Sequence, residues 1–184
     1  MFTRLGLWQR RVCPRFASLR HQVSTFSRSP VEICSPLVSE AFDYLFNHAI
    51  KFDGSTATLY DDDGKKLGEY PATSGRDGVT DQKSSWKGPI PEGDYTLDPK
   101  EISEASGFRG WLRNLLGDWG TYRAPLHPID STQTYGRSGF FIHGGSTPGS
   151  AGCIDVGRCD LELFPQIKDI GHNVDVHVEY PKKQ

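Results

Sequence analysis

Apolar and polar side chains alternate most regularly between residues 173 and 180. One set of positions is apolar and the intervening set is polar: Val174, Val176 and Val178 against Asp175, His177 and Glu179. Because successive side chains of a β-strand point to opposite faces, this alternation predicts a strand with one buried face. Strands are also predicted at 94–97 and 139–142, and a hairpin of 56–60 and 66–70 is predicted around an Asp-Gly turn.

Helical spacing of apolar residues occurs in two places. Within 101–120 the apolar positions recur every three or four residues: Phe108, Trp111, Leu112, Leu115 and Leu116. A shorter set predicts a second short helix: Leu161, Leu163, Phe164 and Ile167. Residues 71–87 and 121–135 are polar or rich in Pro, Gly and Thr, which is typical of loops. Residues 41–46 fit either a short helix or an opening strand.

Composition narrows the class of protein. The 184 residues are 36% hydrophobic and 24% charged, which is typical of a soluble globular protein. No stretch approaches the roughly 20 apolar residues of a membrane-spanning helix. The net charge of −2 argues against nucleic acid as a partner, and four cysteines are too few for a disulfide scaffold. The strands and the 20 glycines together predict a mainly β fold (β-rich α+β), a single domain with one or two short helices.

Charge divides the chain into two parts. Residues 1–31 contain six arginines and no acidic residue. We therefore assign 1–38 to a basic Arg/Ser-rich arm and 39–184 to the folded domain. The arm has the composition of an organelle transit peptide, and it also suits contact with a membrane surface or with import or secretion machinery. A disordered basic tail is the third interpretation. No Sec-type apolar core follows the arginines.

Residues 140–155 contain the candidate chemistry. A buried strand delivers His143 at its end, and a short loop rich in Gly and Ser then presents Cys153 after Gly152. A cysteine is nucleophilic only as the thiolate, and its reference pKa near 8.5 leaves it mostly protonated at neutral pH. A neighbouring imidazole can take that proton and return it to a leaving amine, while glycine leaves main-chain N–H groups free for an oxyanion. These residues fit thiol acyl transfer.

Other interpretations of the cysteine remain open. Free cysteine is most often a small buried apolar residue, and a disulfide between Cys153 and Cys159 is geometrically conceivable. Cys153, Cys159, His143 and His172 are of zinc-ligand type, but no C-x-x-C pair supports a metal site. We therefore expect no metal and no other cofactor.

Several separated motifs resemble one family. Ile142-His143-Gly144, followed by residues 150–154 (SAGCI), is similar to the signature of the L,D-transpeptidase (YkuD-like) catalytic domain. Residues 70–75 (YPATSG) and 88–95 (GPIPEGDY) resemble its strands and its P-x-G-x-[YF] turn. Residues 135–140 (YGRSGF) and the short His-to-Cys loop resemble the Tlde branch, small type VI secretion effectors that attack the peptidoglycan of rival bacteria. This resemblance implies a YkuD-like β-sandwich or mixed-sheet domain.

The resemblance implies a role for each matching residue. Cys153 matches the catalytic nucleophile and His143 the general base. The main-chain N–H groups of Gly152 and Cys153 match the oxyanion hole, with Ser150 and Gly144 as supporting residues.

Two positions depart from the family pattern. Many members have an arginine after the Cys-[Ile/Val] pair, where this chain has Asp155, and a larger polar residue where it has Ala151. The arginine that would bind a substrate carboxylate is therefore unplaced, and Arg137 and Arg158 are its candidates. Asp155 and His127 complete the predicted substrate-binding set.

The function implied by the resemblance is a peptidoglycan-modifying cysteine enzyme. It would cleave or exchange the terminal D-amino acid of muropeptide stem peptides through a Cys153 thioester, as an L,D-carboxypeptidase or L,D-transpeptidase. Two alternatives remain: another thiol acyl-transfer enzyme acting on proteins, and a catalytically silent binding module. The expected partners are peptidoglycan stem peptides and an immunity protein, and the expected place of action is a bacterial periplasm or cell wall.

The long connection before the catalytic strand suggests a lid. Loops of this length in compact domains are usually functional, and the apolar stripe within 101–125 needs a surface to cover. Two interpretations are open: a cap beside the Cys153 cleft, and a helix that completes the core.

Overall fold

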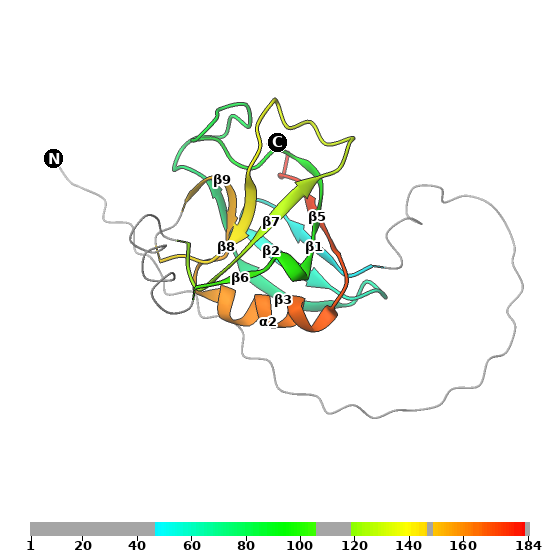
Figure 1. Cartoon of the computed structure of the whole chain (residues 1–184). Coiled ribbons are helices and arrows are strands. Elements are labelled where there is room, and N and C mark those ends of the chain that lie inside the picture. The colour runs from blue at the N-terminus through cyan, green and yellow to red at the C-terminus, as the bar shows by residue number, and fades with distance from the viewer. Residues whose placement is uncertain (1–46, 106–118, 147–148, 183–184) are drawn as a thin grey trace, which may run out of the picture.

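The computed structural model describes residues 47–105, 119–146 and 149–182. Within these residues, ten strands form one mixed sheet that packs against a single α-helix (Figure 1). The strands are β1 (Ala49–Phe52), β2 (Thr56–Tyr60), β3 (Lys66–Pro71), β4 (Thr73–Gly75), β5 (Gly93–Leu97), β6 (Ser103–Glu104), β7 (Tyr122–Pro128), β8 (Phe140–His143), β9 (Ser150–Asp155) and β10 (Val174–Val178). The helices are α2 (Asp160–Ile170) and the 3-10 helices η1 (Pro99–Glu101) and η2 (Gly157–Cys159). The mainly β prediction is confirmed.

The strand order mixes neighbours in sequence with distant ones. It runs β3-β2-β1-β10-β5-β7-β8-β9-β4, with β6 beside β7. The C-terminal strand β10 lies between β1, which is parallel to it, and β5, which is antiparallel. Its three valines are buried, as their alternation predicted. The other parallel pair is β8 with β9, the two strands that contain the candidate catalytic residues.

The β2–β3 hairpin forms where the Asp-Gly turn predicted it. The Asp61 carboxylate accepts hydrogen bonds from the main-chain N–H groups of Asp63 (3.1 Å) and Lys65 (2.8 Å). Gly64 has φ +73°, which a residue with a Cβ rarely adopts. These local bonds close the turn and set the position of the acidic residues beside the start of β1.

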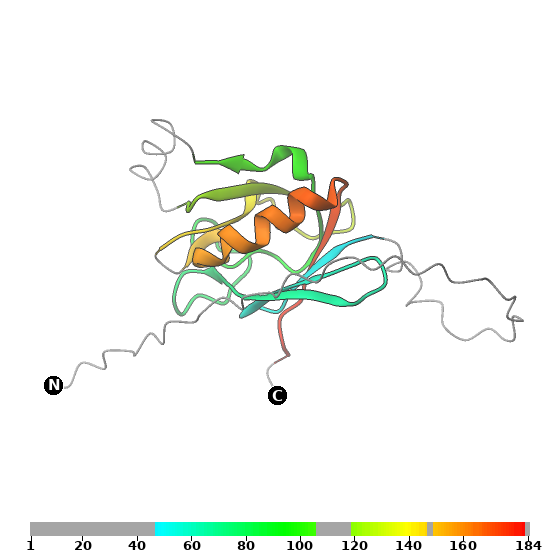
Figure 2. The same ribbon diagram turned by 90° about the horizontal axis from the view of Figure 1, so that it is seen from below.

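Helix α2 contacts both halves of the sheet, which are the half with β1, β2, β3 and β10 and the half with β7, β8, β9 and β4. Figure 2 shows it lying between the β2–β3 hairpin and the strands of the other half. On one side, the Gln166 amide donates to the Tyr70 hydroxyl of β3 at 2.6 Å. On the other side, Phe164 stacks on Tyr122 of β7 with ring centroids 5.6 Å apart. Because Leu163, Phe164 and Ile167 are fully buried, the predicted short helix is confirmed and the core lies beneath it.

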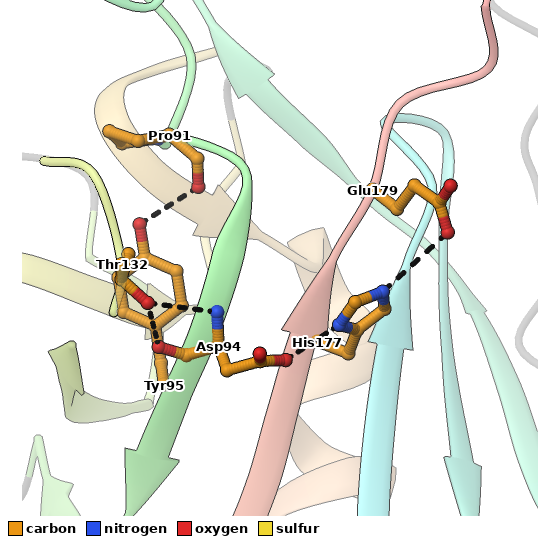
Figure 3. Close-up of polar contacts among 6 residues, drawn as sticks. All are labelled: Pro91, Asp94, Tyr95, Thr132, His177 and Glu179. Atoms are coloured by element: carbon orange, nitrogen blue, oxygen red, sulfur yellow. Dashed lines mark hydrogen bonds and ion pairs between the residues drawn. The ribbon is translucent and has the colours of Figure 1, made fainter. Parts of the chain in front are cut away.

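Side chains distant in sequence hold the turn before β5 (Figure 3). The Tyr95 hydroxyl donates to the Pro91 carbonyl at 2.8 Å. The Thr132 hydroxyl donates to the Asp94 carbonyl (2.6 Å) and accepts from the Asp94 N–H (3.0 Å). On the neighbouring strand, His177 Nδ1 lies 2.6 Å from Asp94 Oδ1. This turn is therefore bonded from both sides of the strand.

Three of the expected loops contain strands. Residues 122–128 form β7, in the middle of the sheet, although Pro125 and Pro128 favoured a loop. Ala124 and Leu126 are buried, so the alternation was present in the sequence. The φ of proline is compatible with extended backbone, and burial between β5 and β8 outweighs the ladder bond that Pro125 cannot donate.

The other two strands arise from long-range pairing. The expected loop at 71–87 contains β4, and the expected loop before Cys153 is largely replaced by β9. These two strands pair with each other, with a register irregularity between Thr73 and Gly75. Short strands of this kind show no clear periodicity in the sequence because each is stabilised by a partner about 80 residues away.

Part of the predicted organisation lies outside the described residues. This applies to the basic arm at 1–38, to residues 41–46 and to the apolar stripe at 108–116. The domain boundary near residue 38 therefore stays a prediction. No helix in the described ranges is long and apolar enough to cross a membrane.

Candidate active site

The parallel pairing of β8 and β9 brings the predicted nucleophile and base to one face. Ile142 pairs with Ile154 and His143 with Asp155. Both isoleucines are fully buried in the core. Because side chains alternate along each strand, His143 and Cys153 lie together on the opposite face, away from the helix-covered core.

His143 is held in one tautomer by its own chain. The side chain is only 3% exposed, and Nδ1 lies 2.6 Å from the carbonyl oxygen of Gly144. A carbonyl can only accept a hydrogen bond, so Nδ1 must carry the proton. Nε2 of the neutral ring is then an acceptor that can take a proton. A main-chain carbonyl thus does what a carboxylate does in many His-containing catalytic sets.

Cys153 is a free, buried thiol. The pKa of Cys153 is raised to about 11, chiefly by burial and to a smaller extent by the nearby Asp155 carboxylate. A hydrogen bond from the Phe141 main chain and the positive charge of Arg137 act in the opposite direction. The thiol is therefore protonated at neutral pH. The conceivable Cys153–Cys159 disulfide does not form, because Cys153 is unpaired.

The residues before Cys153 position its peptide group. The Ser150 hydroxyl donates to the main-chain carbonyl of Cys153 at 2.6 Å. Gly152 has φ +89°, and a Cβ there would overlap with Nη2 of Arg137. Glycine is required at 152 for both reasons: the left-handed backbone and the close approach of the guanidinium.

Arg137 joins the nucleophile strand to the loop before β5. It is 9% exposed, and its guanidinium donates to the main-chain carbonyls of Gln82, Pro89 (2.7 Å) and Gly88 (3.2 Å). These three carbonyls occupy three of its five N–H donors and enclose the guanidinium beside Gly152. Its predicted role in binding a substrate carboxylate stays a prediction, but this environment is that of a positioning residue.

The other predicted substrate-binding residues are spread over the site. Asp155 is buried on the same face as His143, and its carboxylate accepts the Gly157 N–H at 2.8 Å. Arg158 is exposed on η2. His127 is exposed at the far end of β7, where Nε2 lies 2.5 Å from a carboxylate oxygen of Glu101. Asp155 is thus the member of this group that lies beside the catalytic pair.

Sequence reasoning missed a cluster that covers His143. The Trp119 ring lies 5.0 Å from the His143 ring and 5.6 Å from the Phe141 ring, measured between centroids. Arg123, the β7 neighbour of His143, places its guanidinium 5.2 Å from the Trp119 ring and 5.7 Å from the Phe141 ring. We call Trp119, Arg123 and Phe141 the aromatic–arginine cluster. Alternation within 122–128 would have placed Arg123 on this face, had that segment been read as a strand.

Asp160 was also missed, and it connects α2 to the site. This buried carboxylate accepts hydrogen bonds from the N–H groups of Thr121 (2.7 Å) and Tyr122 (3.0 Å). A Cβ at Gly144 would overlap with the same carboxylate. Gly144 therefore lets Asp160 hold the start of β7 against the end of β8, which places Trp119 and Arg123 next to His143.

Only the residues at either end of the predicted lid, 101–125, belong to the described part of the chain. Residues 106–118 lie outside the described ranges, whereas Trp119, directly after them, packs on His143. Whether the apolar stripe covers the site stays a prediction.

The described residues contain one group that could hold a metal ion. It consists of His48, Asp62 and His172, in the other half of the sheet. His172 was named with Cys153, Cys159 and His143 as a residue of zinc-ligand type, but it lies with this separate group. Neither Cys153 nor His143 belongs to it.

The chain is similar to solved L,D-transpeptidase structures. The L,D-transpeptidase from Xylanimonas cellulosilytica is 15% identical, with a TM-score of 0.45 over 72% of this chain and 60% of that one. L,D-transpeptidase 3 from Mycobacterium tuberculosis, solved with a faropenem-derived adduct, is 18% identical, with a TM-score of 0.43 over 71% and 60%. The catalytic domain of the E. faecium L,D-transpeptidase is 16% identical, with a TM-score of 0.43 over 74% and 99%. This chain therefore spans about 60% of the length of the first two.

No curated protein matches this sequence. A family model does: the Tlde1 domain model matches residues 69–178, more than half of the chain. The matched region runs from β3 to the end of β10 and includes Cys153, His143 and the aromatic–arginine cluster. The resemblance to the Tlde branch is thereby confirmed, and the chain belongs to the Tlde1 domain family.

Proposed function

We propose that this protein is a cysteine acyl-transfer enzyme that acts on the stem peptides of peptidoglycan. The observation that carries the proposal is the placement of Cys153 and His143 on one face of adjacent strands, with Nδ1 of His143 bonded to a carbonyl. Membership of the Tlde1 domain family supports a peptidoglycan-modifying enzyme.

The reaction follows from the two side chains. The Cys153 sulfur attacks an amide carbonyl of the stem, and its proton passes to Nε2 of His143. The tetrahedral oxyanion is held by main-chain N–H groups at Gly152 and Cys153. The C–N bond then breaks, His143 returns the proton to the departing D-amino acid, and a thioester remains on Cys153. Water releases a shortened stem, whereas an amine forms a new amide.

The raised pKa of the thiol makes a base necessary. A thiol with a pKa of about 11 does not exist as a stable thiolate at neutral pH in the resting enzyme. The sulfur must therefore lose its proton to His143 for attack on the carbonyl. A thiol that is mostly protonated also reacts slowly with small oxidants.

Arg123 is the proposed site for a substrate carboxylate. The terminal D-amino acid of a stem peptide carries a free carboxylate near the bond to be cleaved. Arg123 is half-buried beside His143, and it lies over two aromatic rings that fix its orientation. A guanidinium in this position can bind a carboxylate through two parallel hydrogen bonds. Arg123 would thus fill the role for which Arg137 and Arg158 were the sequence candidates.

Purified sacculi test the proposal directly. The parent protein and Cys153→Ala are incubated with sacculi, which are then digested to muropeptides and analysed by mass spectrometry. We expect stems shortened by one D-amino acid, or stems with that residue exchanged when a D-amino acid is supplied, with the parent only. Unchanged muropeptides with a folded parent protein would contradict the proposal.

The same experiment distinguishes the two alternatives. A thiol acyl-transfer enzyme for proteins would leave sacculi unchanged but form a thioester with an activated peptide ester at Cys153. A catalytically silent binding module would co-sediment with sacculi but would form no thioester at Cys153. Detection of the acyl adduct on Cys153 by intact-protein mass spectrometry separates these outcomes.

The place of action follows from the proposed substrate. Peptidoglycan lies in the bacterial cell wall or periplasm, so an effector of this family would act there on a rival cell. A producing bacterium would then need an immunity protein that covers the face containing His143 and Cys153. Protection of Cys153 from alkylation by a candidate immunity protein would test this partner.

A further inference from the structure

Three segments distant in sequence meet at the opposite half of the sheet. His48 directly precedes β1, Asp62 lies in the β2–β3 turn, and His172 lies between α2 and β10. Parallel pairing of β1 with β10 begins at Ala49 and Asp175, and the Asp175 N–H donates to the His48 carbonyl at 3.0 Å. The registers of three strands therefore bring two imidazoles and a carboxylate together.

The facing atoms of this group are close together, and those of His48 and Asp62 are buried. One side-chain ligand atom from each of His48, Asp62 and His172 lies within 4.8 Å of the others. Nδ1 of His48 and Oδ1 of Asp62 are 2.5 Å apart. Both atoms are shielded from solvent, although the Asp62 side chain is 48% exposed as a whole. The polar ends of His48 and Asp62 thus point into the cluster and away from water.

Hydrogen bonding does not account for this burial. The contact between His48 and Asp62 meets the distance of an ion pair but not the geometry of a hydrogen bond, and neither buried atom has a hydrogen-bond partner. Buried polar atoms are rarely left without a partner, because the desolvation penalty is then uncompensated. The His48 and His172 rings meet edge to face at 5.3 Å between centroids. All three side chains therefore converge on one point.

We propose that His48, Asp62 and His172 form a binding site for a divalent transition metal ion of the Zn²⁺ type. Imidazole nitrogen and carboxylate oxygen suit Zn²⁺ and its neighbours in the first transition series. Mg²⁺ and Ca²⁺ favour oxygen ligands, which this group offers from one residue only. One carboxylate and two neutral imidazoles leave one positive charge on the filled site, which the adjacent carboxylates of Asp61 and Asp63 offset.

The role of this site is structural. A bound ion would connect the start of β1, the start of β10 and the β2–β3 turn, which no covalent bond joins. Strands β5 and β7 separate this half of the sheet from β8 and β9. The ion would therefore stabilise the fold without contacting the Cys153 thiol. This distinguishes the site from the catalytic pair in both location and chemistry.

Zn²⁺ titration of the full chain tests the proposal. Calorimetry is carried out in a Cys153→Ala background, which removes the catalytic thiol as a competing ligand. We expect one site, with affinity weakened at least about 10-fold in His172→Gln, since even the loss of an outer-shell partner can have that effect. His127→Gln is the matched control, because it removes an exposed, carboxylate-paired histidine outside the cluster. Equal affinities in the parent, His172→Gln and Asp62→Asn would overturn the proposal.

A second measurement guards against other ligands and against misfolding. Co²⁺ bound by nitrogen and oxygen lacks the charge-transfer band of Co²⁺ bound by sulfur, so the absorption spectrum identifies the ligand set. His172 is exposed, and its replacement by Gln should leave the metal-free Tm unchanged. We expect added Zn²⁺ to raise the Tm of the parent and of His127→Gln, but not that of His172→Gln. A spectrum dominated by sulfur, or equal Tm shifts in all three, would contradict the proposal.

Discussion

His143 is the last residue of β8 and His48 directly precedes β1, yet the surroundings of the two histidines differ in kind. Nδ1 of His143 is bonded to a main-chain carbonyl at 2.6 Å, and an aromatic ring covers the imidazole. Nδ1 of His48 is also shielded from solvent, but it faces a carboxylate oxygen without hydrogen-bond geometry. The first histidine has one nitrogen fixed and one available, as a base needs. The second points its nitrogen at an acidic side chain and another histidine.

The difference lies in which atoms complete each site. At His143 the chain itself supplies the partners, because Asp160, Gly144 and the β7 backbone hold the ring and its neighbours in place. At His48 three side chains converge from separate segments, and the facing atoms of His48 and Asp62 have no hydrogen-bond partner. A histidine whose tautomer is set by the main chain is suited to proton transfer, whereas an unsatisfied group of histidines and a carboxylate is suited to a cation.

The largest effect should come from removing the nucleophile. Cys153→Ala should reduce turnover of sacculi by at least about 1,000-fold, because no other group can form the acyl intermediate. The free energy of unfolding should change by about 1 kcal/mol or less, since the thiol is small. Muropeptide mass spectra measure the loss of turnover, and urea unfolding measures the change in the free energy of unfolding. Activity equal to that of the parent would remove Cys153 from the mechanism.

His143→Ala should be almost as damaging, and its effect should not add to that of Cys153→Ala. The two residues act as one unit, so single and double variants should have about the same residual rate. His127→Ala is the matched control and should retain activity, because His127 is paired with Glu101 on the exposed end of β7. Loss of turnover in His127→Ala alone would move the base away from His143.

Arg123→Met should have an intermediate effect on catalysis. Loss of a charged hydrogen bond to the substrate carboxylate should lower kcat/KM by about 10- to 100-fold, corresponding to about 1.5–3 kcal/mol. The loss should largely disappear on stems whose terminal carboxylate is amidated, because the parent then has no charge to bind. Arg158→Met, an exposed arginine on η2, is the control. Equal losses on both substrates would give Arg123 a packing role only.

Asp155→Asn should produce a smaller change, visible in the pH dependence of thiol alkylation. The pKa of Cys153 is raised, so the thiolate fraction and the iodoacetamide rate should climb about tenfold per pH unit from pH 7 to 9.5. Asp155 contributes to that raised value, so its neutralisation should lower the pKa and accelerate alkylation at each pH in this range. Asp169→Asn, an exposed acid on α2, should alkylate like the parent. Slower alkylation of Asp155→Asn than of the parent would contradict the assignment that Asp155 raises the pKa of Cys153.

The smallest effect on catalysis is expected at the other half of the sheet. His172→Gln should leave turnover of sacculi within about twofold of the parent, because exposed substitutions away from the site change little. Chelator treatment of the parent should likewise leave the Cys153 alkylation rate unchanged. A large loss of turnover in His172→Gln with normal folding would show that the two regions are coupled.

Local patterns in the sequence determined several elements and the chemistry. The valines at 174, 176 and 178, the Asp-Gly turn and the apolar spacing in 161–167 each depend on short-range periodicity, so β10, the hairpin and α2 were predictable. The motif residues placed His143 at a strand end and Cys153 after a glycine. Each of these features is set by residues within a few positions of one another.

Only the tertiary structure decided which distant residues share the site. The prolines within β7 made its sequence resemble a loop. Strands β4 and β9 are short and are stabilised by pairing with each other, so neither shows a clear periodicity in the sequence. Pairing of β7 with β8 brings Arg123 to His143, and pairing of β1 with β10 brings His172 toward His48. The physical reason is that side-chain periodicity reports which face of a strand is buried, whereas the neighbours on that face are chosen by long-range strand pairing.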